Sequence, residues 1–456
     1  MLLLALLLFA SQEDILREFQ EFLSIPNVAS DTANIRRNAD WLTKAMQRRG
    51  LSTRLLEAAG APPVVYGELK SPGAKRTFIF YAHYDGQPVD RKDWKTDPFR
   101  PVIHGDRLYA RGASDDKGPI IAMLAALERL KGQQLSANLK FFFDGEEEAG
   151  SPHLAQIVRE NRELLKADAW FICDGPVHPS GKQQLYFGVR GVAAAELSVY
   201  GPNRELHSGH YGNWAPNPAM MLAQLLASMK DDTGRVLISG FYEGVEPLGP
   251  LEKKALAEAP EIDEDLKKEL ALARAEGQGQ KLIELINQPS LNIRGMSSAG
   301  VGPLARNVVP AVATASIDMR LVKGVTADGQ IKRLVDHIRK QGYFVTDREP
   351  DKDMRQTHAK IARVTFEHGY NSARTPMDLP ISREVVAAVE KARGSTVKLP
   401  TMGGSVPLFV FEQELRTPWI GVPMVNHDNN QHAANENIRL RNLWDGIDLM
   451  AALMRL

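Results

Sequence analysis

One stretch of the sequence, residues 78–118, constrains the fold more than any other. It opens with FIFYA, a run of aromatic and β-branched residues typical of a buried strand, and leads directly into His83, Tyr84 and Asp85. On an extended backbone His83 and Asp85 project to the same side. Asp85 can then accept a hydrogen bond from one imidazole nitrogen while the other nitrogen faces a metal ion. The pattern predicts a strand that ends at a polar site.

Other apolar segments end in the same way. Residues 139–143 lead into DGEEEAG, residues 169–173 into DGP, and residues 419–425 into NHDNNQHAANENI, while RGASDDKG precedes an apolar helix. Apolar strands that alternate with helices are typical of a mostly parallel sheet covered by helices on both faces, an α/β fold. Ligands of such sheets bind beyond the carboxyl ends of the strands. We therefore expect one site built from His83, Asp115, Glu147, Glu148, Asp174 and His432.

The middle of the chain has a different order of predicted strands and helices. A chain of 456 residues exceeds a single hydrophobic core. Residues 188–371 contain segments in the order strand, helix, strand, strand, helix, strand, with the last strand expected at residues 343–346. This order predicts an inserted α+β domain of ferredoxin-like topology. The α/β catalytic domain is then expected in two parts, 11–187 and 372–456. Within the insertion, the charged residues 251–286 are expected to form exposed helices.

Composition excludes several classes of protein. Lys plus Arg and Asp plus Glu each total 56, so the net charge is zero and no general attraction to nucleic acid follows. The chain also lacks a glycine loop that would cradle phosphate, which disfavours a two-metal phosphatase or nuclease. The single cysteine, Cys173, excludes an intramolecular disulfide.

The first ten residues, MLLLALLLFA, have the length and composition of the apolar part of a signal peptide, without the usual basic residues before it. The run is too short to span a bilayer, and no other segment is apolar for long enough to do so. We expect residues 1–10 to belong to a signal peptide and the protein to be secreted or periplasmic. The alternative is a cytoplasmic protein whose first helix starts here.

The acidic groups at the strand ends point to metal binding. So many carboxylates in one cleft would raise one another's pKa unless cations compensated for their charge. Two divalent ions would do so, and a ligand set of imidazoles and carboxylates suits Zn²⁺, with Mn²⁺ and Co²⁺ as alternatives. Such ions polarise a carbonyl oxygen and activate water, and one carboxylate that binds neither ion is needed as a general base.

Each of these residues also has an ordinary structural explanation. Asp115 fits a helix cap, Glu147 a solvated helix face, and His432 a surface loop. Their positions after successive strands favour the common site.

Further candidates lie outside the strand ends. His207, in LHSGHYG, is either a loop histidine or a donor to the oxyanion of a tetrahedral intermediate. Gly404 and Ser405 precede a helical-looking segment, where exposed N–H groups bind anions such as a substrate carboxylate; the alternative is a simple turn. Arg320 ends a strand and is either a bidentate partner for a carboxylate or a surface residue.

The sequence resembles the M20 family of di-zinc metallopeptidases, in the branch of carnosinase-like dipeptidases and related carboxypeptidases. The motifs AHYDGQP, DRLYARGASDDKGP, EEEAGSPHL, HSGHYG, GGSVP and HAANENI occur in the family's order, from about residue 19 to the C-terminus. This resemblance implies that His83 and Asp174 bind one metal ion, that Glu148 and His432 bind the other, and that Asp115 bridges the two.

The resemblance also implies roles for the residues around the metals. Glu147 would be the general base, Asp85 would orient His83, and Asp116 would lie outside the metal site. The inserted domain would mediate homodimerisation or act as a lid, and its histidine would reach the site of a partner subunit. The residues implied to bind substrate are His207, Asn307, Arg320, Gly404 and Ser405.

The expected reaction is hydrolysis of the amide bond of a dipeptide or short peptide with a free carboxylate. A water molecule that bridges the two metal ions would attack the carbonyl, and Glu147 would transfer its proton to the leaving amine. An N-acyl amino acid deacylase would use the same residues. A metal-dependent binding protein without catalysis is a further alternative, which the presence of Glu147 disfavours.

Overall fold

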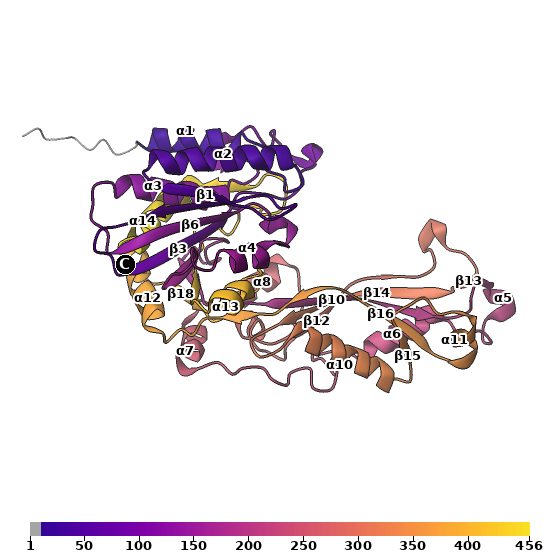
Figure 1. Ribbon diagram of the computed structural model, residues 1–456. Coiled ribbons are helices and arrows are strands. Elements are labelled where there is room, and N and C mark those ends of the chain that lie inside the picture. The colour runs from indigo at the N-terminus through magenta and orange to yellow at the C-terminus, as the bar shows by residue number, and fades with distance from the viewer. Residues whose placement is uncertain (1–10) are drawn as a thin grey trace, which may run out of the picture.

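The computed structural model describes residues 11–456, so the predicted signal peptide at residues 1–10 lies outside the described residues. Across the described range no helix combines the length and the apolar character that crossing a membrane requires. The chain forms an eight-stranded sheet and, extending away from it, a five-stranded sheet (Figure 1). The predicted fold class, a mostly parallel α/β sheet with an inserted α+β domain, is confirmed.

The larger sheet is parallel at its centre. Strand β3 (Arg76–His83) pairs in parallel with β6 (Ala137–Asp144) and with β7 (Ala169–Ile172), and β7 pairs in parallel with β19 (Trp419–Gly421). The carboxyl ends of these four strands therefore meet at one edge. The outer strands of the sheet are β1 (Ser52–Leu56), β2 (Val64–Leu69), β8 (Gln184–Tyr186) and β18 (Val397–Leu399).

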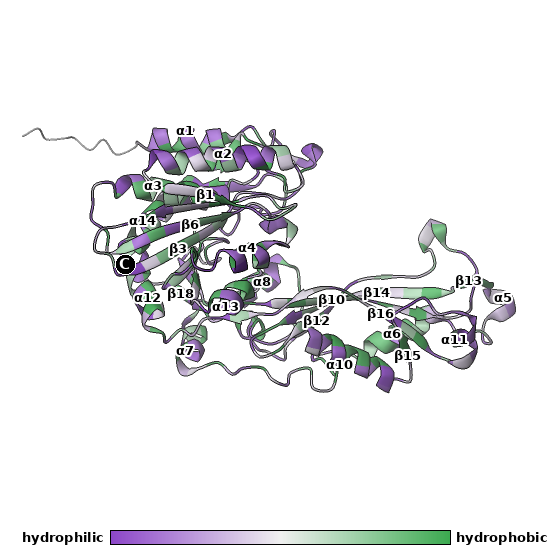
Figure 2. Cartoon of the chain, in the orientation of Figure 1, coloured by the Kyte–Doolittle hydropathy of each residue, from purple (hydrophilic) through white to green (hydrophobic). Residues whose placement is uncertain are grey.

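Both faces of this sheet are apolar because side chains alternate along each strand. In β3, Phe78 and Phe80 belong to one hydrophobic core, while Ile79 and Tyr81 belong to another on the opposite face. Figure 2 shows hydrophilic and hydrophobic residues mixed along α1 and α2, as expected of helices with one buried face. The first core is covered by α1 (Gln12–Leu23), α2 (Thr32–Arg48), α3 (Lys117–Arg129), α12 (Pro380–Arg393) and α14 (Leu440–Leu453), and the second by α4 (Leu154–Glu160) and α13 (Phe409–Leu415).

The smaller sheet has the strand order β12-β14-β10-β16-β15. One correction to the sequence-based prediction concerns its fourth strand, which was expected at residues 343–346. A short strand does form there, but it lies at the edge, and the strand that pairs with β10 is formed by residues 361–370. The elements of this unit are β10 (Gly191–Tyr200), α6 (Pro218–Ala227), β12 (Ser290–Ser297), β14 (Val312–Leu321), α10 (Ala327–Lys340), β15 (Phe344–Thr346), α11 (Lys352–Thr357) and β16 (Ile361–Tyr370).

The chain crosses between the two sheets at paired strands. Strand β9 (Gly188–Val189) pairs antiparallel with β17 (Ala373–Arg374), so the outgoing and returning segments lie side by side. We propose the domain boundaries here, after residues 187 and 371. The remaining elements are β4 (Val102–His104), β5 (Arg107–Tyr109), β11 (Leu206–His207), α5 (Ser208–Tyr211), α7 (Pro250–Glu258), α8 (Asp263–Glu269), α9 (Leu282–Leu285), β13 (Val308–Val309) and β20 (Asn437–Arg439).

Candidate metal and catalytic site

His83 is the last residue of β3 and is almost fully buried. Its Nδ1 lies 3.2 Å from Asp85 Oδ1, and its Nε2 lies 3.0 Å from Asp115 Oδ1. Burial lowers the pKa of His83, but the hydrogen bonds to Asp115 and Asp85 outweigh it and hold that pKa well above its usual range. The ring is therefore oriented from one side by Asp85 and directed at Asp115 from the other.

Asp85 also holds the segment that carries the two glutamates. Its Oδ1 accepts the backbone N–H of Glu147 at 3.1 Å, and its Oδ2 accepts the backbone N–H of Glu148 at 2.9 Å. Both glutamates lie in a short 3-10 helix, Glu147–Ala149, shortly after the end of β6. One buried carboxylate thus positions both the imidazole of His83 and the acidic turn.

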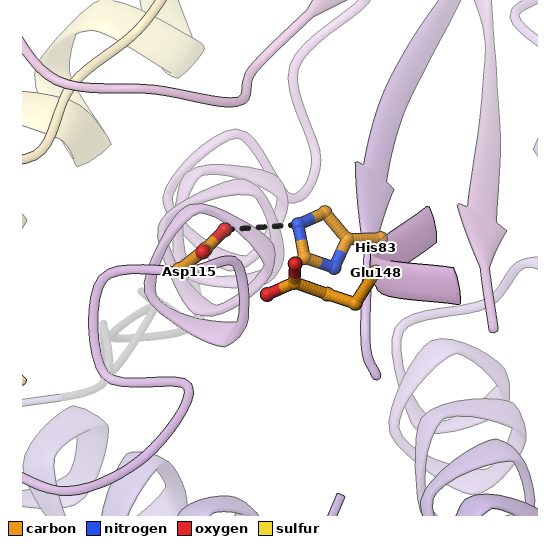
Figure 3. A group of neighbouring side chains, drawn as sticks. All are labelled: His83, Asp115 and Glu148. Atoms are coloured by element: carbon orange, nitrogen blue, oxygen red, sulfur yellow. Dashed lines mark hydrogen bonds and ion pairs between the residues drawn. The ribbon is translucent and has the colours of Figure 1, made fainter. Parts of the chain in front are cut away.

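Asp115 lies between the two imidazoles. Its Oδ1 faces His83, and its Oδ2 lies 2.9 Å from His432 Nε2. Glu148 Oε2 lies 3.2 Å from the same nitrogen of His432. Hydrogen bonds to Asp115 and Glu148 raise the pKa of His432 to about 10. Figure 3 shows His83, Asp115 and Glu148 converging from a strand end, a loop and the turn after β6, close enough to share one ion.

A second set of possible metal ligands comprises His83, Asp116 and Asp174. Asp174 follows β7, and burial and the nearby Asp115 raise its pKa to about 6. Asp116 is fully buried, and its Oδ2 accepts the backbone N–H of His83 at 3.2 Å. The resemblance places Asp116 outside the metal site, whereas the structure puts its carboxylate within reach of His83 and Asp174. Sequence reasoning missed this proximity because a residue at a helix start has an ordinary capping explanation.

The residues present fit divalent cations. Among the described residues, Glu148 Oε1 and Asp116 Oδ1 are buried without a hydrogen-bond partner. Burial, and then the charges of Asp174 and Glu148 against the opposing effect of His83, raise the pKa of Glu147 well above its usual range. Buried carboxylates this close need positive charge, and imidazole and carboxylate donors are suitable ligands for it. Two overlapping ligand groups offer two such positions.

His432 lies on a loop with an unusual backbone. It has φ +60°, and Asn430 and Asn435 on the same loop have φ +57° and +62°. Non-glycine residues in this region are strained and are retained where the surroundings require them. Asp428 anchors the loop because Arg107 and Arg439 both bind its carboxylate, the latter at 2.8 Å. Although burial raises the pKa of Asp428, these hydrogen bonds lower it well below its usual range.

A polar group that includes Arg320 and Ser405 joins β14 of the smaller sheet to the segment before α13. Arg320 Nη1 donates to Ser405 Oγ at 2.7 Å, and Arg320 Nε donates to Asp318 at 3.2 Å. Burial, and then the charge of Glu147, raise the pKa of Tyr370 to about 12. Ser405, by contrast, acts to lower the pKa of Tyr370. The ionisation of Tyr370 therefore responds to both Glu147 and Ser405.

The prediction that a helix starts directly after Ser405 is wrong. Helix α13 begins only at Phe409, so the N–H groups of Gly404 and Ser405 do not belong to its first turn. Instead, Gly404 O accepts the backbone N–H of Arg190 at 3.1 Å. An anion here would bind to Arg320 and the Ser405 hydroxyl rather than to a helix N-terminus.

His207 and Asn307 do not join this group. His207 ends β11 beside β13, and Asn307 O accepts the backbone N–H of Ser208 at 2.9 Å. Both lie near α5 at the far end of the five-stranded sheet, away from β3 (Figure 1). The substrate residues implied by the resemblance thus fall into two sets, and of these five residues only Arg320, Gly404 and Ser405 lie at the junction with the eight-stranded sheet.

Residues 79–456 match the peptidase family M20/M25/M40. The chain is 28% identical to the Cys-Gly metallodipeptidase dug1 of Schizosaccharomyces pombe, over 96% of this chain and 94% of that protein. It is 28% identical to the Beta-Ala-His dipeptidase of Homo sapiens, over 86% of this chain and 76% of that protein. Among solved structures, the M20 family metallo-carboxypeptidase Sso-CP2 from Sulfolobus solfataricus superimposes with a TM-score of 0.83 at 29% identity, covering 97% of this chain and 99% of that chain.

Proposed function

The chain belongs to the peptidase family M20/M25/M40, and on that basis we propose that it hydrolyses the amide bond of dipeptides or short peptides with a free carboxylate. One observation carries the proposal. Asp115 lies between His83 and His432, with Glu147 beside them on the turn that Asp85 holds. This arrangement combines a site for cations with a neighbouring carboxylate that can exchange a proton.

We propose that two divalent ions bind here, with Zn²⁺ as the expected metal and Mn²⁺ or Co²⁺ as alternatives. His83 and Asp174 would hold one ion, Glu148 and His432 the other, and Asp115 would contact both. Asp115 is preferred to Asp116 as the bridging ligand because its two oxygens face two different imidazoles. Asp116 instead accepts a backbone hydrogen bond from His83.

Divalent ions held by these residues would polarise the substrate carbonyl and lower the pKa of water. Glu147 would accept a proton from the attacking water and deliver it to the leaving amine, which requires a carboxylate that is not itself a ligand. Asp85 fixes the backbone of Glu147 and the ring of His83 at the same time. The base and a metal ligand are thus positioned by one side chain.

We propose that Arg320 and Ser405 bind the carboxylate of the substrate. Arg320 already donates to Ser405 Oγ at 2.7 Å, and about a third of its side chain is exposed. A guanidinium binds a carboxylate through two parallel hydrogen bonds, which orients the peptide as well as holding it.

We further propose a homodimer in which the far end of the five-stranded sheet approaches the partner's site. Helix α5, which directly follows His207, lies at the far end of the five-stranded sheet, away from β3 (Figure 1), so we propose that His207 does not act within its own chain. Large apolar side chains are exposed on the same end: Trp214 is 80%, Val301 83% and Leu304 75% exposed. Burying such side chains favours association. His207 and Asn307 would then contribute to the site of the second chain.

A substrate panel tests the proposed specificity. The metal-loaded protein is assayed with dipeptides, with the same dipeptides amidated at the C-terminus, and with N-acetyl amino acids. We expect turnover of free dipeptides and little turnover of the other two classes. Preferential cleavage of N-acetyl amino acids would instead identify a deacylase, which uses the same catalytic groups. Export stays a prediction from residues 1–10, to be tested by N-terminal sequencing of the mature protein.

A further inference from the structure

Glu436 is a fully buried carboxylate on the loop that follows His432. It extends to the separate loop that carries Asp115. Its Oε1 accepts three hydrogen bonds there, from Ser114 N at 2.8 Å, Ser114 Oγ at 2.9 Å and Asp115 N at 2.9 Å. The backbone of the proposed bridging ligand is therefore attached directly to Glu436.

The second oxygen of Glu436 is also fully used. Oε2 accepts Gly112 N at 3.0 Å and Arg111 Nη1 at 2.8 Å. Arg111 is itself buried, and its guanidinium lies 5.3 Å from the centre of the Trp94 ring. Five donors thus converge on one carboxylate, in a place where an unpaired charge would be costly.

These contacts join two segments that are far apart in the sequence. Asp115 and Glu436 are separated by 321 positions, and β5 and β20 pair next to them, with Ala110 N donating to Glu436 O at 3.2 Å. The loop of Asp115 and the loop of His432 are consequently fixed relative to each other. The 2.9 Å approach of Asp115 Oδ2 to His432 Nε2 depends on that relationship.

We propose that Glu436 is a positioning residue for metal binding, which holds the Asp115 carboxylate in register with His432. The inference rests on the metal-binding roles proposed above for Asp115 and His432. Glu436 contacts neither imidazole in the hydrogen bonds of the described residues, so its effect passes through the backbone of Asp115. Partners that orient metal ligands in this way contribute strongly to metal affinity.

A glutamine cannot replace this carboxylate. The amide has nearly the same shape, but one of its two oxygen positions becomes an NH₂ group. Whichever way the amide turns, that NH₂ faces donors: Ser114 and Asp115 on one side, or Gly112 and Arg111 on the other. Glu436→Gln therefore displaces the Asp115 loop while leaving the hydrophobic cores unchanged.

The test compares Glu436→Gln with Glu18→Gln. Glu18 forms a comparable ion pair, 2.6 Å from Arg49 and partly buried, in helix α1 and not at the strand ends that carry the metal site. Co²⁺ affinity is measured by spectroscopic titration of the metal-free proteins, and the free energy of unfolding is measured alongside. We expect Glu436→Gln to bind Co²⁺ about tenfold to a hundredfold more weakly, with Glu18→Gln unchanged in affinity.

Two results would overturn the proposal: an unchanged Co²⁺ affinity in folded Glu436→Gln, or an equal loss of affinity in Glu18→Gln. If Glu436→Gln does not fold, the Co²⁺ affinity of Ser114→Ala is measured instead, because this variant removes the Ser114 hydroxyl, one of the five donors to Glu436. We expect a smaller but measurable loss of Co²⁺ affinity, and no loss would contradict the role. A wild-type protein that binds no Co²⁺ would refute the proposed metal site itself, which is a distinguishable result.

Discussion

The backbone N–H of Glu147 donates to Asp85 Oδ1 at 3.1 Å. The same oxygen lies 3.2 Å from His83 Nδ1, so the expected base and an expected metal ligand share one anchor. Asp85 comes from the segment after β3, and Glu147 from the segment after β6, which are neighbouring parallel strands. The parallel pairing thus brings together the two groups on which the proposed reaction depends.

Replacing Asp85 should therefore affect metal binding and turnover together. In Asp85→Asn the amide NH₂ would face the N–H groups of Glu147 or Glu148, and the hold on the His83 ring would weaken. We expect metal affinity to fall about tenfold to a hundredfold, with kcat lower even at saturating metal. Metal titration and steady-state kinetics on the same preparation measure both. A change in neither would show that Asp85 is only a structural residue.

Arg320→Ala should weaken the recognition of a free carboxylate. Losing a charge-assisted hydrogen bond costs about 1.5–3 kcal/mol, so kcat/KM for a dipeptide should fall by roughly one to two orders of magnitude. The control substrate is the same dipeptide amidated at its C-terminus. Wild type should cleave this amide poorly, and Arg320→Ala should cleave it at about the same rate as wild type. Equal losses for both substrates would argue that Arg320 supports the structure of the junction and does not bind the carboxylate.

The proposed partner contribution of His207 predicts complementation between subunits. His207→Ala and Glu147→Gln should each be nearly inactive and should keep their metal content. Mixed after dissociation and reassociation, they should form dimers with one intact site, recovering about a quarter of wild-type activity per chain if pairing is random. Activity of His207→Ala alone at the wild-type level would exclude the oxyanion role.

The ion pairs of Asp428 with Arg107 and Arg439 predict a pH-dependent contribution to stability. The pKa of Asp428 is depressed in the folded chain by hydrogen bonds from Arg439 and Arg107. A depressed pKa stabilises the fold above the unfolded value of about 3.9, and this stabilisation is lost as pH falls through the folded value. Asp428→Asn should thus lower the free energy of unfolding near neutral pH, and the difference from wild type should shrink below about pH 4. Denaturant unfolding of the metal-free proteins at several pH values measures this difference in the free energy of unfolding. A difference that does not change with pH would contradict the proposed contribution of the ion pairs.

Much of the site was predictable because it follows from local pattern. Each of the strands β3, β6, β7 and β19 is an apolar run that stops at polar residues, and parallel pairing then collects those residues at one edge. The N-cap of α2 is likewise a local feature, because the Asp31 side chain accepts the backbone N–H of Asn34 in its own helix.

Other features depend on contacts between distant segments and could not be predicted. Strand β16 was missed because, among its residues whose burial is described, only Ile361 and Ala362 are buried. Its sequence pattern is therefore weak, and its pairing with β10 determines its position. The contacts of Glu436 with the Asp115 loop join residues more than three hundred positions apart. The HAANENI motif shows a glutamate, Glu436, four residues after His432. The motif does not indicate which residues this glutamate would contact.

Glu147→Gln tests the proposed reaction most directly, by measuring metal content and dipeptide turnover on the same sample. The control is Glu146→Gln, because Glu146 is the adjacent glutamate and bonds His153 instead, at 2.9 Å. We predict that Glu147→Gln keeps its metal and loses about 10²- to 10⁴-fold in kcat, while Glu146→Gln stays near wild type. Turnover by Glu147→Gln at the wild-type rate, with its metal in place, would contradict the assignment of Glu147 as the base.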